Sequence, residues 1–130
     1  MTPDCVLCRI LRDELPSTEV YRDDLCVVLM DIRPVNPGHM LVMPLRHVEL
    51  LGELDQPTIE RLVVVAQRLT VALRRSALQC EAVTVLLADG PAAGQDVAHV
   101  HVHVIPRHID GRCDRQRPGA DADRNRTRHP

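Results

Sequence analysis

Three histidines, His99, His101 and His103, alternate with valines, and this run is the part of the chain best suited to chemistry. Successive side chains of a β-strand point to opposite faces, so an extended conformation places all three imidazoles on one face. An imidazole is a nucleophile when neutral and a general acid when protonated, and it changes charge near neutral pH. The pattern therefore favours a phosphoryl or nucleotidyl transfer in which one ring attacks phosphorus and a second protonates the leaving group.

A loop directly before the histidines has the features of a phosphate-binding segment. It reads Asp-Gly-Pro-Ala-Ala-Gly-Gln over residues 89–95. Its glycines allow backbone N–H groups to approach a phosphate closely, and Gln95 adds a side-chain amide. We expect Gly94 and Gln95 to contact phosphate. A metal ion held by the three histidines is the alternative interpretation of the triad.

Composition limits the function classes. The chain has 130 residues, 45% of them apolar, which fits one domain with a core that must be aliphatic because Phe and Trp are absent. All 16 basic residues are arginines, which excludes Schiff-base chemistry and a phosphate-loop lysine. A single tyrosine and a net charge of −2 argue against nucleic acid as a partner. Neither a signal-peptide pattern nor an apolar run of transmembrane length is present, so we expect a cytoplasmic protein without membrane contact.

Periodicity predicts an α+β fold with about five mostly antiparallel strands, one short helix and one long helix. We expect the short helix over residues 5–13, the long helix over 57–78, and strands over 19–22, 26–30, 39–44, 82–87 and 99–106. Val63, Val64 and Val65 widen the apolar stripe of the long helix, which indicates contacts on more than one side. Residues 1–108 form the predicted domain, and residues 109–130, which are nearly free of apolar side chains, form a predicted disordered polar tail.

The sequence resembles the histidine-triad (HIT) family, whose signature is His-φ-His-φ-His-φ-φ with φ apolar. Residues 99–105 match this signature at every position, and residues 31–44 look like the nucleotide-side segment of the family. Residues 5–10 and 16–24 are similar to bacterial HIT proteins and nucleoside phosphoramidases, whereas the loop at 89–95 resembles that of diadenosine-polyphosphate hydrolases. The resemblance covers residues 5 to about 107.

The resemblance implies a hydrolase or transferase that cleaves a purine nucleotide conjugate at its α-phosphate. His101 would attack phosphorus and carry the nucleotidyl group, His103 would contact phosphate or relay a proton, and His39 would orient or relay from the facing strand. His99 completes the catalytic triad, and Asp31 would accept hydrogen bonds from the ribose hydroxyls. The family pairs two such domains in a homodimer. The implied base pocket consists of five apolar residues that also suit an ordinary core: Val6, Leu7, Ile10, Leu29 and Ile32.

Two positions depart from the family pattern. Ala88 stands where relatives usually carry Asn or Gln near the phosphate, and Asp96 replaces a Ser or Thr that usually donates to it. An ionised carboxylate cannot donate a hydrogen bond and repels phosphate. The N-terminal half and Asp96 favour an AMP-phosphoramidate-like substrate, and the loop favours a dinucleoside polyphosphate. A nucleotide-binding regulator with weakened catalysis is the non-enzymatic alternative.

Cys5 and Cys8 have the spacing of half a zinc site, or of two small thiols at the start of a helix. Zinc-bearing HIT relatives complete such a site with two histidines, which the resemblance places at His47 and His99. A site with four protein ligands is closed and therefore structural. We expect zinc in that role, no organic cofactor, and Cys26 and Cys80 in the core.

Overall fold

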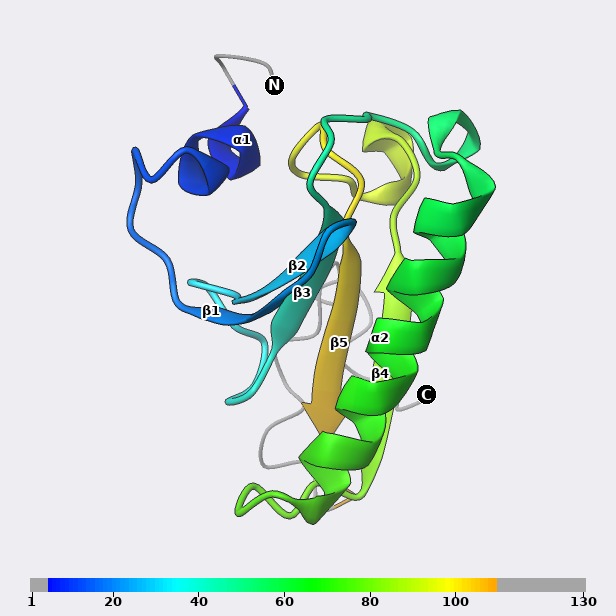
Figure 1. The fold of residues 1–130 in the computed structure, drawn as a ribbon. Helices are drawn as coiled ribbons and strands as arrows, with labels where there is room; N and C mark the ends of the chain where they lie inside the picture. The colour runs from blue at the N-terminus through cyan, green and yellow to red at the C-terminus, as the bar shows by residue number, and fades with distance from the viewer. Residues whose placement is uncertain (1–4, 110–130) are drawn as a thin grey trace.

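The structure, a computed structural model, describes residues 5–109, and its centre is a five-stranded antiparallel sheet (Figure 1). The strand order is β1-β2-β3-β5-β4. The strands are β1 (Glu19–Arg22), β2 (Cys26–Met30), β3 (Met40–Pro44), β4 (Ala82–Leu87) and β5 (Val102–Arg107), and the α-helices are α1 (Val6–Leu11) and α2 (Gln56–Arg75). Two short 3₁₀ helices, η1 (Leu51–Glu53) and η2 (Pro91–Ala93), lie in the connections. The α+β architecture expected from the sequence is confirmed.

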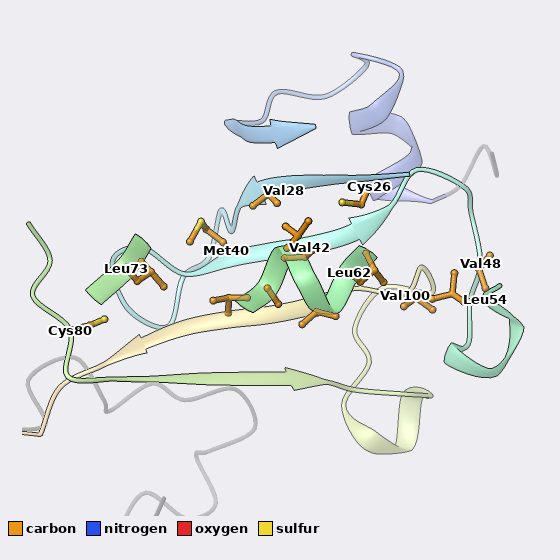
Figure 2. Close-up of a cluster of buried hydrophobic side chains, with 14 residues drawn as sticks. Cys26, Val28, Met40, Val42, Val48, Leu54, Leu62, Leu73, Cys80 and Val100 are labelled. Carbon is orange, nitrogen blue, oxygen red and sulfur yellow. The ribbon is translucent and has the colours of Figure 1, made fainter. Parts of the chain in front are cut away.

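Side-chain alternation gives the sheet two different faces. On one face, valines of β2, β3 and β5 pack against Leu62 and Ala66 of α2, in the buried cluster drawn in Figure 2. On the other face, Val27 and Met43 pack against Leu7 of α1. Because the valines of β5 point toward α2, His103 between them points toward the face of α1. The sheet therefore separates an apolar layer from the face that carries the histidines.

The long helix begins and ends at polar caps. The Asp55 carboxylate accepts a hydrogen bond from the Thr58 N–H, and Pro57 occupies the first turn, where it costs no helical hydrogen bond. The helix ends at Arg75, three residues before the end predicted from apolar spacing. Ser76 adopts an extended conformation, and its hydroxyl donates to the Leu73 carbonyl at 2.7 Å, which ends the helix.

The histidine strand is shorter than predicted. It begins at Val102 rather than at His99, because its pairing with both neighbouring strands begins there. Val102 pairs with Val42 of β3 and with Leu87 of β4, and residues 99–101 have no partner in either strand. The alternation nevertheless continues upstream, since Val100 packs in the same buried cluster as Val102. The N–H of Val100 donates to the Val48 carbonyl at 2.8 Å, outside any strand ladder.

An apolar surface remains uncovered beside the edge strand. A cavity of about 480 Å³ lies between α2 and β4, and Val63 and Val85, which line it, are exposed. Strand β4 is an edge of the sheet, so it also presents backbone groups without a neighbouring strand. Across residues 5–109, no helix has the length and apolar character needed to cross a membrane. The predicted polar tail falls outside the described residues from 110 onward.

Candidate active site and metal centre

The loop between β2 and β3 brings Asp31 and His39 to the edge of the histidine strand. The Asp31 N–H donates to the His39 carbonyl at 3.0 Å, which closes the loop. The buried Asn36 side chain donates to the Pro106 carbonyl at 2.7 Å and fastens the loop to β5. Gly38 has a φ of +93°, a conformation that favours glycine, and an added Cβ would also require Leu78 to move.

A backbone amide sets the protonation of His39 and, through it, of His103. The Val35 N–H donates to His39 Nδ1 at 3.0 Å, so the neutral ring carries its proton on Nε2. That Nε2–H donates to His103 Nδ1 at 2.9 Å, which leaves the proton of His103 on its own Nε2. Asp31 Oδ2 lies 3.4 Å from His39 Nε2. The Val35 amide, His39 and His103 thus form one chain of oriented hydrogen bonds, and the Asp31 carboxylate lies beside it.

A backbone carbonyl does the same for His101. Its Nδ1–H donates to the His99 carbonyl at 2.7 Å, so the lone pair of the neutral ring lies on Nε2. The ring is almost fully buried, at 4% side-chain exposure, and its centroid lies 4.9 Å from that of His103. Its Nε2 faces Asp96, whose Oδ1 is 3.4 Å away. A lone pair fixed on this nitrogen has the chemistry of a nucleophile, and the ring of His103 lies beside it.

Burial favours the neutral rings of His39 and His103 at physiological pH. Loss of solvation lowers the pKa of His103 to about 4, helped by the neighbouring His101 and His39 and opposed by Asp31 and Asp96. Burial also lowers the pKa of His39, against the opposing effect of the Asp31 carboxylate. A neutral ring is what each hydrogen bond in the chain requires, because a protonated ring has no nitrogen left to accept.

The ring of His99 joins a second cluster, formed with Cys5, Cys8 and His47. His99 Nδ1 lies 3.5 Å from Cys5 Sγ and 3.6 Å from Cys8 Sγ, and His47 Nδ1 lies 3.3 Å from Cys8 Sγ. All four donor atoms lie within 4.8 Å of one another. A tetrahedral zinc ion with ordinary Zn–S and Zn–N bonds separates sulfur and nitrogen by about 3.6 Å. The donor set and its spacing therefore fit a tetrahedral metal ion.

The outer contacts of this cluster also suit a metal centre. His99 Nε2–H donates to the Pro44 carbonyl at 2.9 Å, which turns the lone pair of Nδ1 toward the thiols. His47 Nε2 lies 3.9 Å from the Glu49 carboxylate. Burial lowers the pKa of His99 to about 4 and raises that of the Cys5 thiol. Because a metal ion needs neutral imidazoles and deprotonated thiols, metal binding at this cluster would release protons from the cysteines.

The residues proposed for nucleotide binding lie in different environments. Leu7 and Leu29 are buried in the cluster on the α1 face, with Ile10 packed against it, while Val6 and Ile32 are exposed. The role of these five residues in binding a base therefore stays a prediction. The phosphate role of Gly94, which has a φ of +97°, likewise stays a prediction.

Gln95 has one partner in its own loop and one in the segment before η1. Its Oε1 accepts from the Gly90 N–H and its Nε2 donates to the Glu49 carbonyl, both at 2.8 Å. The side chain therefore shapes the loop in this structure, and a phosphate contact would require it to exchange one of these bonds.

Sequence reasoning missed the groups that orient the site. Val35, Asn36 and Pro44 act through a backbone amide, a buried side-chain amide and a backbone carbonyl. Residue type gives no signal for a backbone donor or acceptor. Asn36 lies in the loop between Pro34 and Pro37, and its side chain is buried. A buried polar side chain needs a hydrogen-bond partner, so the residue type of Asn36 was the one available signal.

Comparisons with known proteins agree with these observations. A family model described as the HIT domain matches residues 12–110. An uncharacterized HIT-like protein of Borreliella burgdorferi is 42% identical over 105 residues, covering 80% of this chain and 76% of that protein. Adenylylsulfatase HINT3 of Arabidopsis thaliana is 34% identical over 80% of this chain, which spans only 52% of that longer protein. The crystal structure of a zinc-bound histidine triad family protein from Mycobacterium smegmatis superimposes with a TM-score of 0.81 at 35% identity, covering 93% of this chain and 85% of that one.

The assigned ring protons can be checked by NMR. In long-range ¹H–¹⁵N spectra we expect the neutral ring of His39 to carry its proton on Nε2 and the neutral form of His101 to carry its proton on Nδ1. We expect His103 to remain neutral on acidification until the pH approaches about 4, because burial disfavours the charged ring. His103→Asn identifies the resonances. A His103 ring that titrates near 6.5, or the opposite tautomer at His101, would contradict the hydrogen-bond chain.

The lowered pKa of His103 also predicts that the folded protein loses stability in acid. An unfolded histidine takes up a proton near pH 6.5, whereas His103 in the folded state does so only near pH 4. Between these values the unfolded state binds more protons, so the contribution of His103 to the free energy of unfolding falls as the pH drops. Urea denaturation at several pH values measures this dependence, and the His103→Asn variant should show a weaker one.

Proposed function

The chain belongs to the HIT family, and from that premise we propose that it is an enzyme that cleaves a nucleotide conjugate at its α-phosphate through a nucleotidyl adduct on His101. The observation that carries the proposal is the fixed tautomer of His101, whose Nδ1–H is held by the His99 carbonyl at 2.7 Å. This contact leaves an Nε2 lone pair as the reacting group of a buried ring.

The proposed reaction has two steps. In the first, Nε2 of His101 forms a bond to the α-phosphorus while the bond to the leaving group breaks, and an amine leaving group takes up one proton from solvent. In the second, water attacks phosphorus, the P–N bond to His101 breaks, and one proton returns to solvent with release of the nucleoside monophosphate. His103, with its proton on Nε2, donates a hydrogen bond to the phosphoryl oxygens. His39 and Asp31 hold His103 in that orientation.

The substrate class follows from the charges around His101. Asp96 stands 3.4 Å from Nε2 and repels each added phosphate, so we propose an AMP conjugate with a nitrogen leaving group rather than a dinucleoside polyphosphate. One relative is named an adenylylsulfatase, which supports the view that chains of this kind act on adenylyl conjugates. Asp31, on the His39 side, is proposed to accept hydrogen bonds from the ribose.

We also propose that Cys5, Cys8, His47 and His99 hold one structural zinc ion. The spacing of the donor atoms supports it, as does the zinc-bound structure from Mycobacterium smegmatis. Four protein ligands leave no open position for substrate, so the ion would not take part in the reaction. Its effect would be to join α1 to the segment that contains His101.

A homodimer is proposed from the uncovered apolar surface between α2 and β4. Val63 and Val85 are exposed there beside an edge strand, and a second copy in a two-fold arrangement would cover both.

Replacement of His101 tests the proposed reaction. We expect His101→Ala to lower the turnover of adenosine 5′-phosphoramidate by about a thousandfold or more, since the attacking atom is lost. His108→Ala, which changes a histidine just beyond β5, is the matched control and should turn over like the wild type. Turnover by the His101→Ala variant within a few-fold of wild type would refute a covalent role for this ring.

Metal analysis tests the zinc site. We expect one zinc ion per chain in protein purified without chelator, and much less in Cys8→Ser, because three ligands bind zinc far more weakly than four. The matched control is Cys80→Ser, a buried cysteine outside the cluster, which should keep its zinc. Removal of zinc from the wild type should lower the melting temperature, because the ion binds the folded state. Wild-type protein that takes up no zinc would contradict the proposal.

Sedimentation tests the dimer. We expect the wild type to sediment as a dimer at micromolar concentration and Val63→Asp to sediment as a monomer, because the charge would be buried at the interface. Val20→Asp changes another exposed valine, on β1, and should leave the dimer intact. A wild type that stays monomeric would argue against this surface as an interface.

A further inference from the structure

Asp96 places a negative charge beside the atom that would react. Its Oδ1 lies 3.4 Å from His101 Nε2, and its side chain is 73% exposed while that of His101 is 4% exposed. The carboxylate therefore stands at the opening of the site, between solvent and the buried ring. A bound substrate brings its phosphorus within about 3–3.5 Å of Nε2. Any substrate must consequently hold its phosphate next to Asp96.

A cavity of about 330 Å³ continues outward from Asp96. It is lined by Cys5, Val6, His47, Glu49, Asp96, Val97 and Ala98. Two of these residues are carboxylates, Asp96 and Glu49, and none is an arginine. Val6, Val97 and Ala98 add an apolar wall. A short alkyl chain that ends in an ammonium group matches this combination, with methylene groups on the valines and the charge between the two carboxylates.

A zinc ion at the adjacent cluster would leave the charge of the cavity wall negative. Cys5 and His47 belong both to the cavity wall and to the proposed metal site. One divalent ion with two thiolates and two neutral imidazoles has no net charge, so Asp96 and Glu49 still determine the charge of the wall.

From these contacts we propose that Asp96 is a specificity-determining residue that selects conjugates whose leaving amine carries a second, positively charged amino group. The inference rests on the proposed cleavage at the α-phosphate. The cation offsets the repulsion between Asp96 and the substrate phosphate, whereas an anionic leaving group adds to it. The cavity beside Asp96 is the proposed subsite for that leaving group.

A series of three substrates isolates the charge. We would measure kcat/KM for adenosine 5′-phosphoramidates of 1,4-diaminobutane, butylamine and 4-aminobutanoate, which share the P–N bond and a four-carbon chain but end in a cation, a methyl group or an anion. For the wild type we expect that order of preference, with about a tenfold difference between the cation and the anion. The difference should shrink at about 1 M salt, where exposed charges are screened.

Variants assign the effect to the residue. Asp96→Asn should reduce the ratio between the cationic and anionic substrates to within about threefold, because the carboxylate that distinguishes them is gone. Glu49→Gln should reduce the ratio by a smaller factor, since the Glu49 carboxylate lies beside His47, whereas that of Asp96 lies beside His101. Glu60→Gln removes one exposed carboxylate from α2 and should leave the ratio at its wild-type value. Because Asp96 is exposed, its replacement should leave the fold intact, which circular dichroism checks.

The outcomes separate the two proposals. Equal rates for the three substrates in the wild type, or a ratio that Asp96→Asn does not change, would overturn the role of Asp96 and leave the proposed cleavage standing. Failure of the wild type to cleave any of the three would contradict the proposed function, and the specificity would fall with it.

Discussion

Backbone groups determine which nitrogen of each site histidine carries its proton, and the chemistry of the site depends on this assignment. The Val35 amide donates to His39, the His99 carbonyl accepts from His101, and the Pro44 carbonyl accepts from His99. A backbone group cannot change its role as donor or acceptor, so each ring has one tautomer as long as the fold holds. Chemically identical side chains thereby obtain different orientations: the lone pair of His101 faces Asp96, and that of His99 faces the thiols.

The two faces of the sheet make this arrangement possible. The valines between the histidines pack in the apolar layer under α2, which fixes the rotation of the segment about its own axis. The rings must then project to the opposite face, where α1 and the loop before β3 supply their partners. A polar replacement of Val102 or Val104 would act on catalysis through the core, although neither side chain faces the site.

Much of this organisation could be predicted from the sequence. The strands at 19–22, 26–30 and 82–87 were predicted at their observed bounds, because alternation and turn residues mark them clearly. The pairing of Cys5 and Cys8 with His47 and His99 came only from family resemblance, since local spacing gives no information about contacts between residues 39 to 94 positions apart. The start of β5 was misplaced by three residues because strand pairing, which depends on where partner strands end, leaves no trace in local alternation. The end of α2 was misplaced because the hydroxyl of Ser76 outweighs the apolar stripe that continues past it.

In the proposed reaction, Nε2 of His101 is the atom that bonds to phosphorus. The decisive measurement is ³¹P–¹⁵N coupling in protein that carries ¹⁵N-labelled histidine, quenched in alkali during turnover of adenosine 5′-phosphoramidate and digested to the peptide around residue 101. We expect one phosphorus coupled to Nε2 of that ring, because Nδ1 is held by the His99 carbonyl. Phosphorus on Nδ1, on His99 or His103, or on no histidine would contradict it.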